Sequence, residues 1–164
     1  MSNLSFEIKT TEDFFKMLIE DYKEFCVNRT SSRHALHCAI VAWHLTDWAY
    51  KEFIKPTTQF KGKQDKKNHW KYFLKEIKDS CPELQIMNDI TDGTKHFSLD
   101  RPSKIKETNL HNGAFDQSFD HSFDTSYLYI IENNTKIYFE KAIQAVILFW
   151  EKYLLSKCAH SVKL

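Results

Sequence analysis

Apolar residues recur in steps of three and four over four long stretches of the chain. These stretches are residues 11–28, 33–51, 66–79 and 140–157. Such spacing places an apolar stripe along a helix, so each stretch predicts a helix that packs on a core. Thr11 is the expected N-cap of the first helix. Pro82 suits the first turn of a fifth helix, which we expect to stop or turn at Asp92-Gly93.

The region before the last helix has the pattern of β structure instead. Residues 103–110 alternate weakly and predict an edge strand, and residues 127–131 and 135–139 flank Asn133-Asn134 as in a hairpin. We therefore predict a mainly α fold: a bundle of about five helices with a small antiparallel β-hairpin or meander before the last helix.

The length of the chain and of its connections favours one domain. At 164 residues the chain fits a single helical domain that spans residues 1–164, with residues 1–9 as a loose lead-in. A short link, residues 29–32, joins the first two helices and makes them antiparallel neighbours. Either Ser31 or Ser32 is the expected N-cap of the second helix.

Composition narrows the class of protein. Hydrophobic residues at 42% and aromatic residues at 15% indicate a globular protein with an aromatic core, and a net charge of +1 gives no overall attraction to nucleic acid or membrane. The four cysteines are scattered without a C-x-x-C pair, and the N-terminus has no signal-peptide pattern. These features favour reduced thiols and a cytoplasmic location. The 33–51 stretch is too short and too rich in histidine to cross a bilayer, so we expect no membrane partner.

The 33–51 stretch also carries the first candidate chemistry. Asp47 is its only formal charge between the flanking cations, and His44 lies one turn earlier on the same helical face. A carboxylate among apolar and aromatic residues is costly unless a partner compensates it, so we expect a partner from the second polar segment of the chain. The predicted polar cluster, a candidate binding site, consists of His44, Asp47, Asp92, Lys95 and His96.

Two interpretations of this cluster remain open. The favoured one is structural: Asp47 pairs with Lys95 or a protonated histidine such as His96 and fixes the packing register, with no metal or other cofactor. The alternative is a metal site, because mixed histidine and carboxylate ligands from different helices are common in bundles. Its ligands would be His44, Asp47, Asp92 and His96, although the chain has no H-E-x-x-H motif.

Arg29 and His34 form an R-x4-H pair, which resembles the motif of HEPN-type ribonucleases, a family of small helical bundles. The resemblance implies that Arg29 and His34 handle the phosphate and 2′-hydroxyl of RNA, usually across a dimer. In that family the motif begins the last main helix, whereas here it begins the second. The structural interpretation is an ordinary helix N-terminus.

One region of the chain is strongly basic. Between Lys51 and Lys78, nine lysines stand against Glu52, Asp65 and Glu76, and no arginine is present. Interleaved aromatic residues, among them Trp70, would suit stacking on single-stranded nucleic acid. The lack of arginine argues against recognition of base edges. A solvated helix face explains the lysines without any nucleic acid.

Two phrases of the sequence carry a wider resemblance. Residues 42–48 (AWHLTDW) and 89–97 (DITDGTKHF) resemble uncharacterised bacterial proteins, often carried on mobile elements, with the motifs A-W-H-L-x-D-W and D-I-x-N-G-x-K-H-F. Asp92 stands where that group more often has asparagine. The resemblance implies that the two polar segments belong together and implies no activity.

These observations give two expectations for function. The first is a non-enzymatic cytoplasmic binding or accessory module of a mobile genetic element, which acts alone or as a homodimer on an unknown protein or small-molecule partner. Nucleic acid is not the expected partner, and the basic Lys51–Lys78 region, which we take for a solvated helix face, is the one place where it could bind. The alternative is a HEPN-like or metal-dependent ribonuclease or phosphodiesterase. Sequence alone favours the first.

Overall fold

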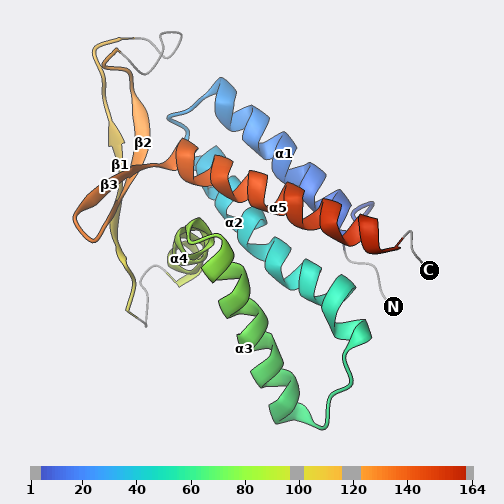
Figure 1. Cartoon of the computed structure of the whole chain (residues 1–164). Coiled ribbons are helices and arrows are strands. Elements are labelled where there is room, and N and C mark those ends of the chain that lie inside the picture. Colours follow the sequence, from blue (N-terminus) through green and yellow to red (C-terminus); the bar gives the residue numbers. More distant parts are fainter. Residues whose placement is uncertain (1–4, 97–101, 116–122, 162–164) are drawn as a thin grey trace.

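The computed structural model is mainly helical (Figure 1) and describes residues 5–96, 102–115 and 123–161. The helices are α1 (Thr11–Val27), α2 (Ser32–Ala49), α3 (Lys63–Ser80), α4 (Glu83–His96) and α5 (Phe139–Ser161). A π-helical turn, η1 (Tyr50–Ile54), and a 3-10 turn, η2 (Lys55–Thr57), follow α2 directly. The strands β1 (Ile105–His111), β2 (Tyr127–Glu132) and β3 (Thr135–Tyr138) form one antiparallel sheet in that order. The predicted fold class is confirmed. Residues 1–4 of the expected lead-in and Phe97 lie outside the described residues.

The first two helices are antiparallel neighbours, as the short link predicts. The Phe14 ring near the start of α1 stacks on Trp48 near the end of α2, with ring centroids 4.8 Å apart. Ser31 is the N-cap of α2 and accepts a hydrogen bond from the His34 N–H. In Figure 1 α1 and α5 run beside each other, and α2 passes under α5 and diverges from it towards its C-terminal end.

The N-cap of α1 is Thr10, so the prediction of Thr11 is wrong by one residue. The Thr10 hydroxyl accepts from the Asp13 N–H at 3.0 Å, and the Asp13 carboxylate accepts from the Thr10 N–H at 3.1 Å. This reciprocal capping box satisfies two backbone donors at the helix start. Thr11 is buried instead and gives both its N–H and its hydroxyl to Glu52 in η1, at 2.6 and 2.7 Å.

The core lies between α2 and the helices around it. Trp150 of α5 is 0% exposed, and its indole N–H donates to the Ala42 carbonyl at 3.2 Å. Ala39, Ala42 and Ala49 are fully buried on α2, and their small side chains let neighbouring helices approach closely. A long helix with small residues therefore forms the centre of the bundle.

Helix α4 continues through Gly93 to His96, so the predicted stop at Asp92-Gly93 is wrong. A glycine inside a helix costs about 1 kcal/mol relative to alanine. Tertiary contacts offset this cost: Met87 is fully buried, and the buried Thr91 hydroxyl lies within hydrogen-bonding distance of the Met87 and Ala39 carbonyls, at 2.8 and 3.3 Å.

The sheet lies at the start of α5 (Figure 1) and confirms the predicted hairpin. Asn133 and Asn134 have φ values of 47° and 66°, the left-handed conformation that a two-residue hairpin turn of this type needs and that asparagine tolerates. Strand β1 pairs only with β2 within the described chain, which makes it an edge strand as predicted. Ile130 is buried and fixes the face of the sheet that packs on the helices.

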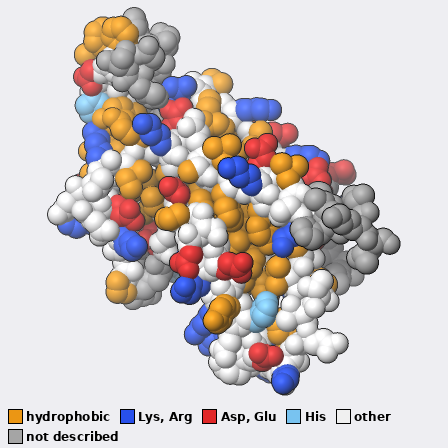
Figure 2. Space-filling model, viewed as in Figure 1, with side chains coloured by type: hydrophobic (Ala, Val, Ile, Leu, Met, Phe, Trp, Pro, Cys, Tyr) orange, Lys and Arg blue, Asp and Glu red, His pale blue; other side chains and the backbone are white. Residues whose placement is uncertain are grey.

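Figure 2 shows one face of the molecule, with hydrophobic side chains along its middle and charged side chains of both signs around them. No helix in the described part of the chain is long and apolar enough to cross a membrane.

Candidate functional site

Asp47 is not the buried carboxylate that the sequence suggested. Its side chain is 47% exposed and forms a salt bridge with Lys51, one turn later on the same helix. The prediction that Lys95 or His96 neutralises Asp47 is therefore wrong. The apolar residues of α2 face the core, while His44 and Asp47 lie on the side that reaches solvent. An exposed pair of this kind contributes at most about 1 kcal/mol to stability.

The predicted polar cluster does not assemble. The Thr91 hydroxyl of α4 lies 3.3 Å from the Ala39 carbonyl, whereas Asp47 lies eight residues further along α2, about 12 Å along the helix axis. Ile90 shares a cavity wall with Ser32 and Leu36, so the end of α4 follows α2 towards its N-terminus, away from Asp47.

The distance between Asp47 and the end of α4 also separates the ligands of the alternative metal site. The proposed ligands were His44, Asp47, Asp92 and His96. Over the described ranges of the chain, no three histidine, cysteine or acidic side chains come together in a way that could hold a metal ion.

Asp89 is the carboxylate that the fold buries. Its side chain belongs to a residue only 3% exposed, and it accepts hydrogen bonds from the Gln85 amide and the Ser103 hydroxyl, both at 2.6 Å. The Ser103 hydroxyl in turn accepts from the Ile105 N–H at 3.0 Å. Asp89 therefore ties α4 to the start of β1, and its role is structural.

Arg29 and His34 face different partners. Arg29 lies in the turn before α2, and its guanidinium is 3.6 Å from the Glu140 carboxylate of α5. His34 Nε2 lies 2.7 Å from an Arg33 nitrogen and 3.6 Å from Glu24 on α1. Two side chains with carboxylates on separate helices do not form the shared phosphate site that the R-x4-H resemblance implies.

The strongest concentration of one charge lies between the end of α2 and the start of α3. There a cavity of about 520 Å³, here called the lysine groove, is lined from both sides by basic side chains. The lining lysines are Lys51, Lys55, Lys63, Lys66 and Lys67. Asp47 is the one acidic residue of the lining, and Lys51 already pairs with it. In Figure 1 this is the end of the molecule where a loop joins η2 to α3.

An aromatic floor supports the groove. Tyr50 and Trp70 line it, with their rings edge to face at 4.8 Å, and Phe73 packs behind both. Tyr50 is buried, and burial together with the nearby Asp65 carboxylate raises the pKa of its hydroxyl. Trp70 is half-buried, so part of its ring remains available to a ligand. The groove therefore combines ammonium groups with an aromatic surface.

The acidic residues of the basic region are used elsewhere. Glu52 accepts from the Thr11 N–H and hydroxyl at the start of α1, and Asp65 accepts from the Lys61 N–H at 2.9 Å just before α3. Carboxylates in these positions satisfy backbone donors at helix N-termini. Because both are held in this way, neither lines the lysine groove.

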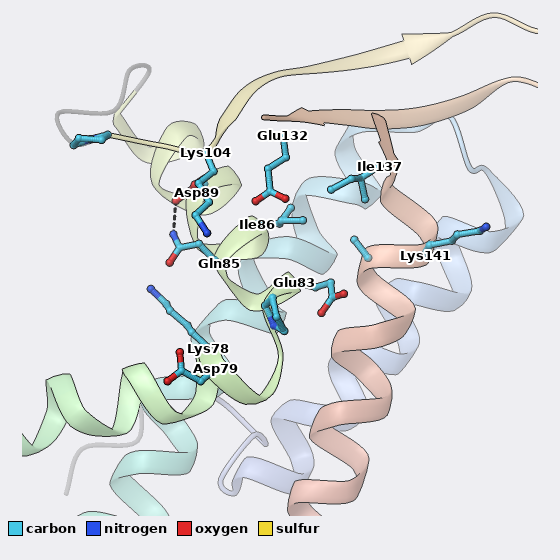
Figure 3. A pocket seen from close by; sticks show the side chains of 13 residues that line it. Lys78, Asp79, Glu83, Gln85, Ile86, Asp89, Lys104, Glu132, Ile137 and Lys141 are labelled. Carbon is cyan, nitrogen blue, oxygen red and sulfur yellow. Dashed lines mark hydrogen bonds between the residues drawn. The ribbon is translucent and has the colours of Figure 1, made fainter. Parts of the chain in front are cut away.

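A second cavity of about 550 Å³ lies between α4, the sheet and the start of α5 (Figure 3). We call it the mixed-charge pocket, because its lining carries both signs. Its charged lining includes Glu83, Glu132 and Lys104, and Ile86 and Ile137 contribute apolar surface.

Sequence reasoning found one of these two sites in part. The basic Lys51–Lys78 region contains the lysine groove, but Lys71 and Lys75 do not line it and Lys78 lies over the Trp43 ring, 4.7 Å from its centroid. The mixed-charge pocket was missed, because its residues come from five elements (α3, α4, β2, β3 and α5) and the segments between them, without a sequence motif. Comparisons with protein-family models, with characterised proteins and with solved structures gave no match.

Proposed function

We propose that this protein is a non-enzymatic binding module that holds single-stranded nucleic acid in the lysine groove. The observation that carries the proposal is the convergence of five lysines from η1, η2 and α3 on a cavity with one acidic residue in its lining. Like charges held together at a surface repel one another, and a bound polyanion relieves that repulsion. Phosphate contacts of this kind supply most of sequence-independent nucleic-acid binding.

The aromatic floor favours a single strand over a duplex. Trp70 lies in the concave lining between the lysines, where an unpaired base can reach its ring and a base within a duplex cannot. Lysine acts as a point charge and lacks the planar fork with which arginine reads guanine. We therefore expect binding that depends weakly on sequence.

Other parts of the proposal rest on separate observations. Arg29 and His34 each face a different carboxylate, which supports a binding role over an RNA-cleaving one. Cys26, Cys38 and Cys81 are free thiols, which suits a reducing cytoplasm. An accessory role on a mobile element rests on the resemblance of the two sequence phrases.

The test is a fluorescence-anisotropy titration with a labelled single-stranded RNA of mixed sequence. We expect binding by the native protein and a roughly five- to thirtyfold loss in a Lys63→Gln, Lys67→Gln double variant, since each phosphate contact contributes up to about 1 kcal/mol. The slope of log K against log salt should shrink by about 1.4, or about 0.7 for each lysine removed.

A matched control variant loses the same number of positive charges at positions outside the groove. The Lys71→Gln, Lys75→Gln double variant alters the same helix by the same charge outside the groove, and should bind within about twofold of the native protein. If both double variants lose affinity equally, general electrostatics explain the binding and the groove is not the site. If the native protein cleaves the RNA, the non-enzymatic proposal fails.

A further inference from the structure

The mixed-charge pocket brings together charges that the fold does not use. Glu132 stands at the end of β2, Lys104 just before β1, and Glu83 in the first turn of α4. Within residues 5–96, 102–115 and 123–161, none of these three side chains forms a salt bridge. They differ in this from Lys75 and Asp79 nearby, which pair at 2.7 Å.

The walls of the pocket are fixed in place. The Asp89 carboxylate, with Gln85 and Ser103, holds α4 to the segment that carries Lys104. Residue pairing of Glu132 with Thr135 and with Ile105, the residue after Lys104, fixes the end of β2 beside the same segment. The charged groups are therefore presented by elements whose backbones are held by hydrogen bonds.

The Glu132 and Lys104 side chains enter the pocket in different directions. In Figure 3 Glu132 reaches from the sheet towards Ile86, and Lys104 points down beside Gln85. Lys141, also in the lining, points away along the outer side of α5. The Glu132 carboxylate thus lies near the apolar surface of Ile86, and the Lys104 side chain lies near Gln85.

From this arrangement we propose that the pocket binds a small zwitterion with a short apolar body, such as a free aliphatic amino acid. The ammonium group of the ligand lies against Glu83 and Glu132, its carboxylate against Lys104, and its apolar body on Ile86 and Ile137. A volume of about 550 Å³ lies within the range of small-molecule sites. Both charges of the ligand gain a partner that the fold leaves open, so neither sign alone satisfies the pocket.

Glu83 has one further contact, which the ligand does not disturb. Its carboxylate accepts a weak hydrogen bond from the Cys81 thiol at 3.5 Å, and burial together with this carboxylate raises the pKa of Cys81 to about 12. The thiol therefore stays neutral near pH 7.

The test compares three ligands of one shape. Leucine carries both charges, 3-methylbutylamine lacks the carboxylate, and 4-methylpentanoate lacks the amine. With isotope-labelled isoleucine methyl groups, we expect leucine to shift the Ile86 and Ile137 signals saturably, and each single-charge analogue to bind about fivefold or more weakly.

Two neutral variants identify the groups. In Lys104→Gln, leucine and the amine should bind equally; in Glu132→Gln, leucine should lose most of its advantage over the acid. If all three ligands bind the native protein alike, or if none shifts these methyl signals, the proposal is overturned. None of these residues lines the lysine groove, so this result and the RNA titration are independent.

Discussion

The lysine groove and the mixed-charge pocket have nearly the same volume, about 520 and 550 Å³, but different lining charges. The groove is mainly positive, and the pocket carries both signs. The difference lies in what each region does with its carboxylates. Around the groove, Glu52 and Asp65 accept backbone N–H groups at helix starts, which leaves the lysines largely uncompensated. Around the pocket, Asp89 has the structural role, and Glu83 and Glu132 remain in the lining.

The two cavities also contain two aspartates with different roles. Asp47 belongs to the groove and is half exposed beside Lys51, whereas Asp89 belongs to the pocket wall and is buried in a hydrogen-bond network. The comparison shows that the charge a cavity offers to a ligand depends on which nearby carboxylates already accept hydrogen bonds within the fold. Cavity size does not distinguish the two.

The largest expected effect is on stability and separates the two aspartates. Asp89→Ala leaves the Gln85 and Ser103 donors without their acceptor and should lower the free energy of unfolding by about 2–3 kcal/mol. Asp47→Ala removes an exposed pair and should cost less than about 0.5 kcal/mol. Thermal unfolding followed by circular dichroism checks this, with a drop of about 5–10 °C expected for Asp89→Ala. Equal losses would mean that Asp47 is structural after all.

The salt concentration should change the affinity of the two sites for their ligands by different amounts. Between 50 and 200 mM salt, binding of single-stranded RNA by three or four lysine–phosphate contacts should weaken roughly 20- to 50-fold. Binding of leucine in the pocket involves no net charge and should change by less than about twofold. The same anisotropy and methyl-shift titrations at both salt concentrations measure this difference. A salt-independent RNA affinity would contradict the role of the groove.

The smallest effect sharpens the role of Asp47. Asp47→Asn removes the one acidic residue from the lining of the groove and releases Lys51 from its salt bridge. RNA affinity should therefore rise about two- to threefold, since an exposed charge pair is worth a few tenths of a kcal/mol or more. Leucine binding should not change. A loss of RNA affinity would indicate that Asp47 orders Lys51 for the ligand.

Much of the fold was predictable from local chemistry. Ser31 could be expected to cap α2, and Asn133-Asn134 to form the hairpin turn, because each follows from side-chain and backbone preferences within a few residues. Gly93 misled the prediction, because the tertiary contacts of Thr91 that hold α4 together are invisible in a local pattern. Local signals therefore predicted the elements, and tertiary packing decided the length of α4.

The candidate sites were less predictable. The pairing of Asp47 with Lys51 was available as an i, i+4 signal, but the apolar sequence around Asp47 suggested burial. The lysines of α3 were visible as a basic run, yet the sequence does not show which of them face Lys51 and Lys55 across a turn of the chain. Glu83, Lys104 and Glu132 meet only through the fold.

The most direct test of the central claim is lysine footprinting. Acetylation of surface lysines, read by mass spectrometry with and without single-stranded RNA, reports which ammonium groups the ligand covers. We predict protection at the five lysines of the groove, Lys51, Lys55, Lys63, Lys66 and Lys67, and unchanged reactivity at Lys71, Lys75 and Lys104. Protection that falls on Lys71 and Lys75, or that spreads evenly over the surface, would contradict the assignment of the groove as the binding site.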